Sequence, residues 1–338
     1  MASKRSIVRE EPTEQTGSVA TIPSGQSFMV QQPSFKNVLV CTDFSPVSQL
    51  AISEAVHLCR TTGAQLYLLH VCEPEPLASR NSSDRHSLIE ITHESQSELD
   101  ALLTKVQEDG VSAEGLLREG KPARTILGVL EELSVDLAVM GTHGFSGLER
   151  MVFGSTVETV LRSASCPVMT IGSRAGAHKE HGVRGPVVFA TNFVEPTTQA
   201  IRFAAQFANQ SGTRVHCLNV LPVSMESETE PTIISQIMSE ALHHLVAKEP
   251  IFADEPIRAV TYGSELSHAI VDYAKVNHAE LIVLGIRRKP NHAANLLPRV
   301  TYRIIVTASC PVLAVSFPDN WPKPGCACEV KSSGRTHH

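Results

Sequence analysis

The chain of 338 residues contains an internal sequence repeat. The run Thr42-Asp43-Phe44 is matched 149 residues later by Thr191-Asn192-Phe193, and "SASCPVMTI" from Ser163 is matched 144 residues later by "TASCPVLAV" from Thr307. The offset changes little along the chain, as a duplication with small length changes in loops would produce. The length also suits about two domains of roughly 150 residues each. We therefore expect two similar domains in tandem.

Each repeat alternates short apolar runs with stretches of helical periodicity. In the first repeat the run from Val38 to Cys41 is followed by a stretch that places Ala51, Ala55, Leu58 and Cys59 on one helical stripe and stops at Gly63. Later apolar runs are "QLYLLHV", "VSAEGLL", "VDLAVMG" and "CPVMTIG", with helical patterns between them. Strands that alternate with helices predict an α/β fold with a parallel sheet.

Composition shifts suggest where the domains begin and end. We predict a disordered segment over 1–34, which is rich in Ser, Glu, Gln and Pro without a period. The first domain is predicted over 35–173 and the second over 185–317. A polar, Gly-containing linker over 174–184 separates them, as is typical of domain boundaries. A tail over 318–338 completes the chain.

Charge and hydropathy exclude several classes of protein. The net charge of −6 and the pI near 6.2 argue against a nucleic-acid binder. No apolar run approaches the roughly 18 residues that a membrane span needs. The N-terminus carries Glu10, Glu11 and Glu14 in place of an apolar signal region. We therefore expect a cytoplasmic protein that contacts no membrane.

The eight cysteines are scattered, and most lie in apolar runs, which is typical of buried free thiols. Cys166 and Cys310 both precede a proline at the start of a last strand; packing explains them better than reactivity, because the second repeat keeps this cysteine while it loses other candidate site residues. The pair Cys326 and Cys328 in the tail allows a metal or redox role, or incidental thiols in solvent.

A glycine-rich stretch, "VMGTHGFSGLERMVFGSTVETVL", follows the fourth predicted strand of the first repeat. Gly141, Gly144 and Gly154 stand at G-x2-G-x9-G spacing, and Ser155-Thr156 open the next predicted helix. In open parallel sheets, ligands bind beyond the carboxyl ends of the strands. A helix start offers unpaired N–H groups and a positive dipole end, which suits a polyphosphate. The alternative is that the glycines only form turns and that Ser155 is an N-cap.

These segments resemble the universal stress protein family, through "VLVCTDFS", "LLHV", "MGTHGFSGLERMVFGST" and "CPVMTI". The resemblance implies two tandem Rossmann-like domains, each a five-stranded parallel sheet of order 3-2-1-4-5 with helices on both faces. It also implies that the domains pair through their last strands, as an intramolecular pseudo-dimer. The glycine pattern is that of the family's ATP-binding branch, so ATP is the expected ligand, with Mg²⁺ possible.

The resemblance also assigns binding residues. The residues at the family's positions are Asp43 for the ribose, Val71 for the adenine through its backbone, Met140, Gly141, His143 and Gly144 for the phosphate loop, and Gly154, Ser155 and Thr156 for the phosphates. Many family members have a basic residue where this chain has Phe145.

Several of these residues have ordinary structural alternatives. Asp43 can equally head an Asx turn in "DFSP". His143 and Arg150 can be solvent-exposed loop residues. We interpret His70, at the end of the second strand, as a packing residue; Asn219 stands at its place in the second repeat.

The second repeat lacks most of the glycine pattern. Gly285 remains, but Arg288 stands at the place of Gly144, Pro298 at that of Gly154 and Arg299 at that of Ser155, and Asn192 replaces Asp43. Proline has no N–H to offer a phosphate. The basic run "IRRKP" can attract an anion by charge, or be a solvated loop. The sequence predicts one nucleotide per chain, in the first domain.

Three functional hypotheses follow. The favoured one is a nucleotide-binding regulatory module, in which ATP changes the conformation or assembly of the domain pair in a stress response. The second is a slow ATPase or phosphotransferase; we predict no catalytic or metal-ligating residues, because "GTHGFSG" holds no carboxylate. The third is a structural dimer without nucleotide. Under all three, exposed edge strands favour homo-oligomers.

Overall fold

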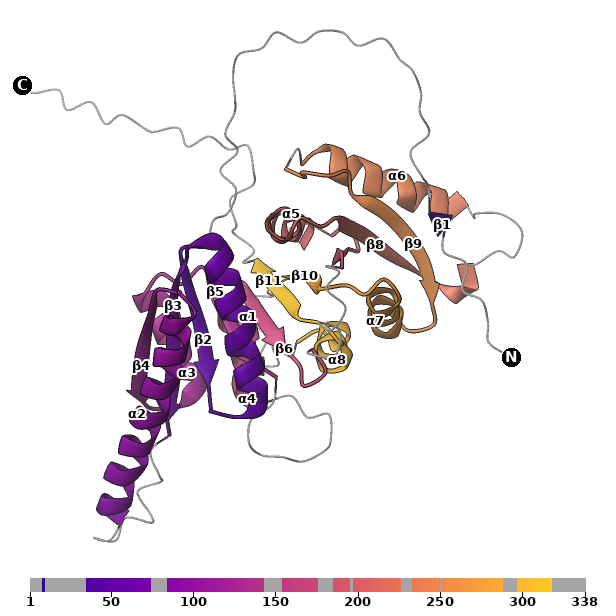
Figure 1. Cartoon of the computed structure of the whole chain (residues 1–338). Coiled ribbons are helices and arrows are strands. Elements are labelled where there is room, and N and C mark those ends of the chain that lie inside the picture. The colour runs from indigo at the N-terminus through magenta and orange to yellow at the C-terminus, as the bar shows by residue number, and fades with distance from the viewer. Residues whose placement is uncertain are drawn as a thin grey trace, which may run out of the picture.

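A computed structural model describes residues 8–9, 35–73, 84–142, 154–175, 185–194, 197–225, 233–249, 251–287 and 297–317 (Figure 1). Among these residues, no helix is both long enough and apolar enough to cross a membrane. Of the residues singled out in the sequence, the following lie outside the described part: His143, Gly144, Phe145, Arg150, Arg288, Cys326 and Cys328.

The first repeat folds into alternating strands and helices, as the sequence pattern predicts. Its elements are β2 (Asn37–Thr42), α1 (Pro46–Thr62), β3 (Gln65–Cys72), α2 (Asp84–Glu108), β4 (Ala113–Glu119), α3 (Pro122–Glu132), β5 (Leu137–Gly141), α4 (Ser155–Ser163) and β6 (Val168–Ile171). The predicted apolar stripe of α1 is buried, and the helix ends at Gly63 in the left-handed region (φ 70°).

The second repeat gives the same series. Its elements are β7 (Val187–Ala190), the 3₁₀ turn η3 (Thr197–Gln199), α5 (Ala200–Ser211), β8 (Val215–Pro222), η4 (Val223–Met225), α6 (Ile233–Ala247), β9 (Ile257–Gly263), α7 (Leu266–Val276), β10 (Leu281–Arg287), α8 (Arg299–Thr307) and β11 (Val312–Phe317).

One sheet runs through both domains. Its strand order is β1-β9-β8-β7-β10-β11-β6-β5-β2-β3-β4. Within each repeat the strands are parallel and follow the predicted order 3-2-1-4-5. The two halves join where β6 pairs antiparallel with β11, with Met169 opposite Leu313. The expected fold and the pairing through the last strands are confirmed.

Helices cover both faces of this sheet (Figure 1). Because side chains alternate along a strand, Val38 and Val40 of β2 lie in the layer beneath α1 and α2, and Leu39 lies in the layer beneath α3 and α4. In the second domain, α5 and α6 share the first layer, and α7 and α8 the second. The strands are buried on both sides, which explains their continuous apolar runs.

The two halves share core contacts beyond the strand pairing. Phe35, at the start of the first domain, is buried against α5 of the second, with its ring centroid 5.3 Å from that of Phe207. Polar contacts also cross the seam: Thr170 Oγ1 donates to the carbonyl of Val312, and Ser316 Oγ donates to that of Leu161, each over 3.2 Å. The tandem domains therefore pack as a pair.

A short strand from the N-terminal segment is also described. β1 (Val8–Arg9) pairs antiparallel with β9, at the outer edge of the second domain's sheet. The other residues of 1–34 lie outside the described part.

Candidate functional site

The carboxyl ends of β2 and β5 meet at one edge of the first domain. Cys41 is in register with Met140, so Asp43 directly follows one strand and Thr142 the other. Gly141 lies against the start of α1: a Cβ there would be 3.1 Å from Val47 Cγ1 and 3.2 Å from the backbone nitrogen of Ser48. Gly141 is therefore needed for the close approach of α1, which holds the Asp43 turn against the end of β5.

Asp43 forms the Asx turn that the sequence left open. Its Oδ1 accepts from the backbone N–H of Ser45 over 3.1 Å, and Phe44 has a left-handed backbone (φ 63°) whose N–H donates to Thr42 Oγ1 over 3.0 Å. A carboxylate has further lone pairs beyond the one used in this turn. Asp43 is half-buried at the edge, so its charge is held in place next to the strand ends.

The hydroxyls at the start of α1 bond within the protein. Ser45 is the N-cap, and its Oγ accepts from the N–H of Ser48 over 3.2 Å. Ser48 Oγ donates to the carbonyl of Ser45 over 2.9 Å and contacts Thr42 Oγ1 at 3.1 Å. This network fixes the direction in which α1 leaves the edge.

α4 begins at the same edge. Gly154 is its N-cap, with no side-chain cap, and its N–H donates to the carbonyl of Thr142 over 3.2 Å. Ser155 is therefore the first helical residue, and its reading as an N-cap is wrong. The first-turn N–H groups of Ser155, Thr156 and Val157 have no acceptor within the helix. The positive end of α4 is thus held beside the end of β5.

Val71 and His70 lie at the end of β3, the neighbouring strand. Val71 is half-buried and in register with Arg118 of β4. His70 Nδ1 lies 2.9 Å from the carbonyl oxygen of Thr42, and its ring centroid is 4.4 Å from that of Phe44. A carbonyl only accepts, so Nδ1 carries the hydrogen. Both contacts fit the interpretation of His70 as a packing residue.

The structure thus brings together the described candidates at one edge: Asp43, Val71, Met140, Gly141, Gly154, Ser155 and Thr156. The Met140 side chain is buried in the core, so only its backbone can meet a ligand. His143 and Gly144 of the same loop lie outside the described residues.

The matching edge of the second domain is built differently. Asn192 Oδ1 accepts from the N–H of Val194 over 3.2 Å, the turn that Asp43 makes. Pro298 is the N-cap of α8, and its carbonyl accepts from the N–H of Tyr302 over 3.0 Å. Proline has no N–H, so the bond from Gly154 to Thr142 has no counterpart. Exposed Arg299 occupies the place of Ser155.

Comparisons with known proteins agree with the tandem organisation. The model of the universal stress protein family matches the chain twice, over residues 34–172 and 184–316. The chain belongs to the universal stress protein family. Universal stress protein YxiE of Bacillus subtilis is 34% identical over 146 residues, which cover 40% of this chain and 99% of that protein. A Mycolicibacterium smegmatis universal stress protein is 24% identical over 301 residues, covering 85% of this chain and 99% of its own.

A solved structure that covers most of the chain shows the same fold. A universal stress protein from Archaeoglobus fulgidus DSM 4304 has a TM-score of 0.64 at 20% identity and covers 85% of this chain and 99% of its own. Another universal stress protein has been solved in complex with cAMP; it is 20% identical and covers 40% of this chain and 97% of its own, with a TM-score of 0.32. The cAMP is a ligand of that protein.

Thr142, which lies at the carboxyl edge of the first domain, was not singled out from the sequence. Thr142 is fully buried and central to the edge: its N–H donates to the carbonyl of Ile171 over 2.9 Å, and its carbonyl accepts from Gly154. It links the start of α4 to β6, the strand at the seam. The sequence feature that could have indicated it is its position: Thr142 is a polar residue directly after a buried apolar run, between Gly141 and Gly144.

The described cysteines of this universal stress protein are free, as predicted. Burial raises the pKa of the Cys41, Cys59, Cys217 and Cys310 thiols to about 12. Cys166 and Cys310 are both buried, in line with a packing role. Within the described ranges, no group of three or more His, Cys, Asp or Glu could hold a metal ion.

Proposed function

We propose that this universal stress protein binds an adenine nucleotide, ATP with Mg²⁺, at the carboxyl edge of its first domain. The observation that carries the proposal is the start of α4. Its first-turn N–H groups, which have no acceptor within the helix, lie at the end of β5, where the bond from Gly154 to Thr142 anchors them. A helix N-terminus with glycine at its cap favours a phosphate group, because its N–H groups and dipole attract negative charge.

The proposed contacts follow from what each group can donate or accept. Ser155 and Thr156 add hydroxyl donors to the backbone N–H groups of the first turn, and His143 and Gly144 complete the phosphate loop. Asp43 accepts from the ribose hydroxyls. Its turn does not need a charge, since Asn192 makes the same turn with an amide. A carboxylate at this place is therefore better explained by a ligand than by the fold.

The second domain acts in this proposal as a built-in pairing partner. Its edge offers Pro298 and Arg299 in place of Gly154 and Ser155, so it takes no nucleotide. The proposed site and the seam are physically linked, because Thr142 bonds both to Gly154 and to Ile171 of β6. ATP would regulate conformation or assembly if it favours one arrangement of the pair over another.

The test is a calorimetric titration of the full chain with Mg-ATP, after any nucleotide that copurifies with the protein has been removed. We expect one site per chain. Gly154→Pro should abolish binding: the backbone at Gly154 (φ −63°) already suits proline, so the variant should fold while it loses the N–H. Thermal unfolding confirms that it does.

Pro298→Gly is the matched control and should leave the single site unchanged. Two sites per chain, or unaltered affinity in Gly154→Pro, would contradict the proposal. If the unmodified chain binds no nucleotide, the protein is a structural dimer instead.

A further inference from the structure

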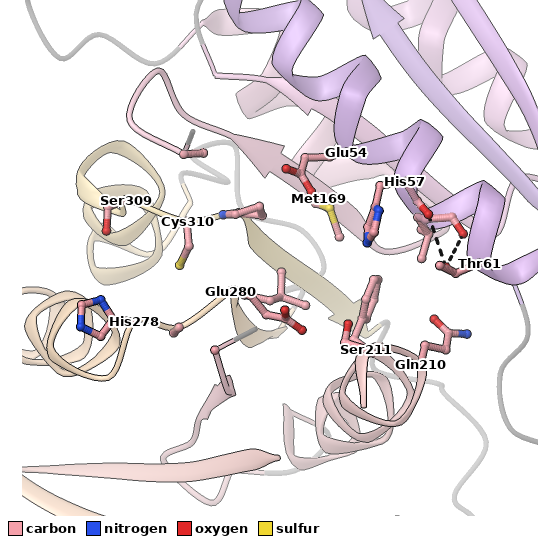
Figure 2. Close-up of a pocket in the computed structure, with 17 residues that line it drawn as sticks. Glu54, His57, Thr61, Met169, Gln210, Ser211, His278, Glu280, Ser309 and Cys310 are labelled. Carbon is pink, nitrogen blue, oxygen red and sulfur yellow. Dashed lines mark hydrogen bonds between the residues drawn. The ribbon is translucent and has the colours of Figure 1, made fainter. Parts of the chain in front are cut away.

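A pocket of about 370 Å³ lies between the two domains, on the face of the sheet that α1 and α5 cover (Figure 2). Pockets at domain junctions are frequent ligand sites, and this volume falls within their usual range. Its lining comes from α1, from β6 and the turn after it, from the end of α5, and from the turns before β10 and β11. We call it the junction pocket.

We propose that the junction pocket binds a small organic cation, in which an ammonium or guanidinium group is carried on an apolar body. Two carboxylates line it: Glu54 from α1 of the first domain and Glu280 from the second (Figure 2). The described lining residues include no lysine or arginine; their basic side chains are the histidines His57 and His278. Both carboxylates have other polar contacts, but each offers about four lone-pair sites and can accept from a ligand as well.

A hydroxyl on the α1 wall supports the same choice of ligand. Thr61 Oγ1 donates its hydrogen to the carbonyl of Leu58 over 2.8 Å, shown as a dashed line in Figure 2. With its hydrogen engaged, this oxygen presents only lone pairs to the pocket. A ligand that donates hydrogen bonds, such as an ammonium group, satisfies it; a carboxylate or phosphate does not.

The place for the apolar body is formed by side chains from both domains. Leu58 of α1 and Phe207 of α5, at corresponding positions of the two repeats, line the pocket with Met169 and Leu281. Phe207 is also held by Phe35, at a centroid distance of 5.3 Å. The apolar surface is thus fixed by the core that joins the domains, and is suited to an aliphatic or aromatic group.

The position of Glu280 also holds a carboxylate in the first domain. Its counterpart in the first domain, Asp136, accepts from the backbone N–H groups of Lys36 and Asn37 over 2.8 and 2.9 Å. In the second domain Pro186 stands at the place of Asn37 and has no N–H to donate. One of the two N–H donors of the first domain therefore has no counterpart, and Glu280 lines the junction pocket.

The junction pocket is distinct from the proposed nucleotide edge. Asp43 precedes the first residue of α1, whereas Glu54 lies at the middle of the helix and Thr61 in its last turn. The helix has 17 residues and, at 1.5 Å per residue, is about 25 Å long. The two sites share α1 but no residue, so the pocket is a separate site and can be titrated in the absence of nucleotide.

The probe for the test is 2-phenylethylammonium, and its control is 3-phenylpropionate, which has a similar body and the opposite charge. Both are titrated into the full chain at low salt, followed by ligand-observed NMR and calorimetry. We expect one site per chain for the cation and none for the anion. Glu280→Gln and Glu54→Gln should each weaken binding roughly tenfold or more, because each removes a charge-assisted contact.

Glu108→Gln, at the exposed end of α2, is the matched control and should bind as the unmodified chain does. Thr61→Val keeps the shape of the α1 wall and should weaken binding by a smaller factor. The proposal is overturned if the cation fails to bind at millimolar concentration, if the anion binds equally well, or if both glutamate variants keep full affinity.

Discussion

The two halves of this universal stress protein form equivalent hydrogen bonds at the end of their first strand, in one case through different residue types. Phe44 and Phe193 both have left-handed backbones and donate to the threonine two positions before them over 3.0 Å. The carbonyl of that threonine accepts from His70 in the first half and from Asn219 in the second, each over 2.9 Å. At this position the fold therefore accepts either residue, because both donate the same hydrogen bond.

The carboxyl edges of the two domains differ in the hydrogen-bond donors that they offer. Gly154 and Pro298 have nearly the same backbone conformation (φ −63° and −52°), so the fold accepts either residue, but only glycine supplies an N–H. Asp136 and Glu280 also stand in different surroundings: Asp136 accepts from the N–H groups of Lys36 and Asn37, whereas Glu280 lines the junction pocket and faces Pro186 at the place of Asn37. In two copies of one fold, some positions differ although the fold accepts either residue. Such positions are the ones to examine for function.

The largest effect expected is on the contact between the halves. Phe35→Ala should lower the free energy of unfolding by about 3–5 kcal/mol, because Phe35 is 3% exposed and packs on α5 of the other half. Denaturant unfolding measures this. Val276→Ala, at a position 63% exposed, is the control and should change stability by no more than about 0.5 kcal/mol. An equally small effect of Phe35→Ala would mean that the halves do not stabilise each other through this core.

A smaller effect separates the two equivalent carboxylates. Asp136→Ala removes two hydrogen bonds to backbone N–H groups and should lower the free energy of unfolding by about 1–3 kcal/mol. Glu280→Ala should cost less, because Pro186 offers no equivalent N–H. The comparison is made on matched unfolding curves; equal losses would show that Glu280 has kept the capping role of its counterpart.

The smallest effect at neutral pH concerns the buried thiols, in which both halves should behave alike. Cys41 and Cys59 in the first half and Cys217 and Cys310 in the second have pKa values of about 12 because of burial. The thiolate is the reactive form, so alkylation near pH 8 should wait for unfolding. Mass spectrometry of each cysteine follows this, and rapid labelling of Cys310 in the folded protein would contradict its packing role.

The same thiols predict a loss of stability at alkaline pH. In the unfolded chain a thiol ionises near a pKa of 8.5, whereas in the folded protein these four stay protonated until about pH 12. Their contribution is fully present below pH 8 and falls as the pH rises between these values. The fall is at most about 1.4 kcal/mol per pH unit for each thiol, measured by unfolding at a series of pH values.

The sequence by itself determined the repeat, the alternation of strands and helices, and the difference between the two edges. These features are local: apolar periodicity fixes which element forms, and the presence of Gly154 or Pro298 fixes whether an N–H exists at that point. The sequence alone left Asp43 open between an Asx turn and a ligand contact, because one aspartate side chain is suited to either.

Only the tertiary structure decided what lies between the halves. Glu54 and Glu280 are more than two hundred residues apart in the chain, and no periodicity relates them. They line one pocket because β6 pairs with β11 and Phe35 packs on α5. Thr142 likewise reads as an ordinary loop residue until its bonds to Gly154 and Ile171 are seen. Contacts of this kind depend on how complete elements pack, which local residue preferences do not specify.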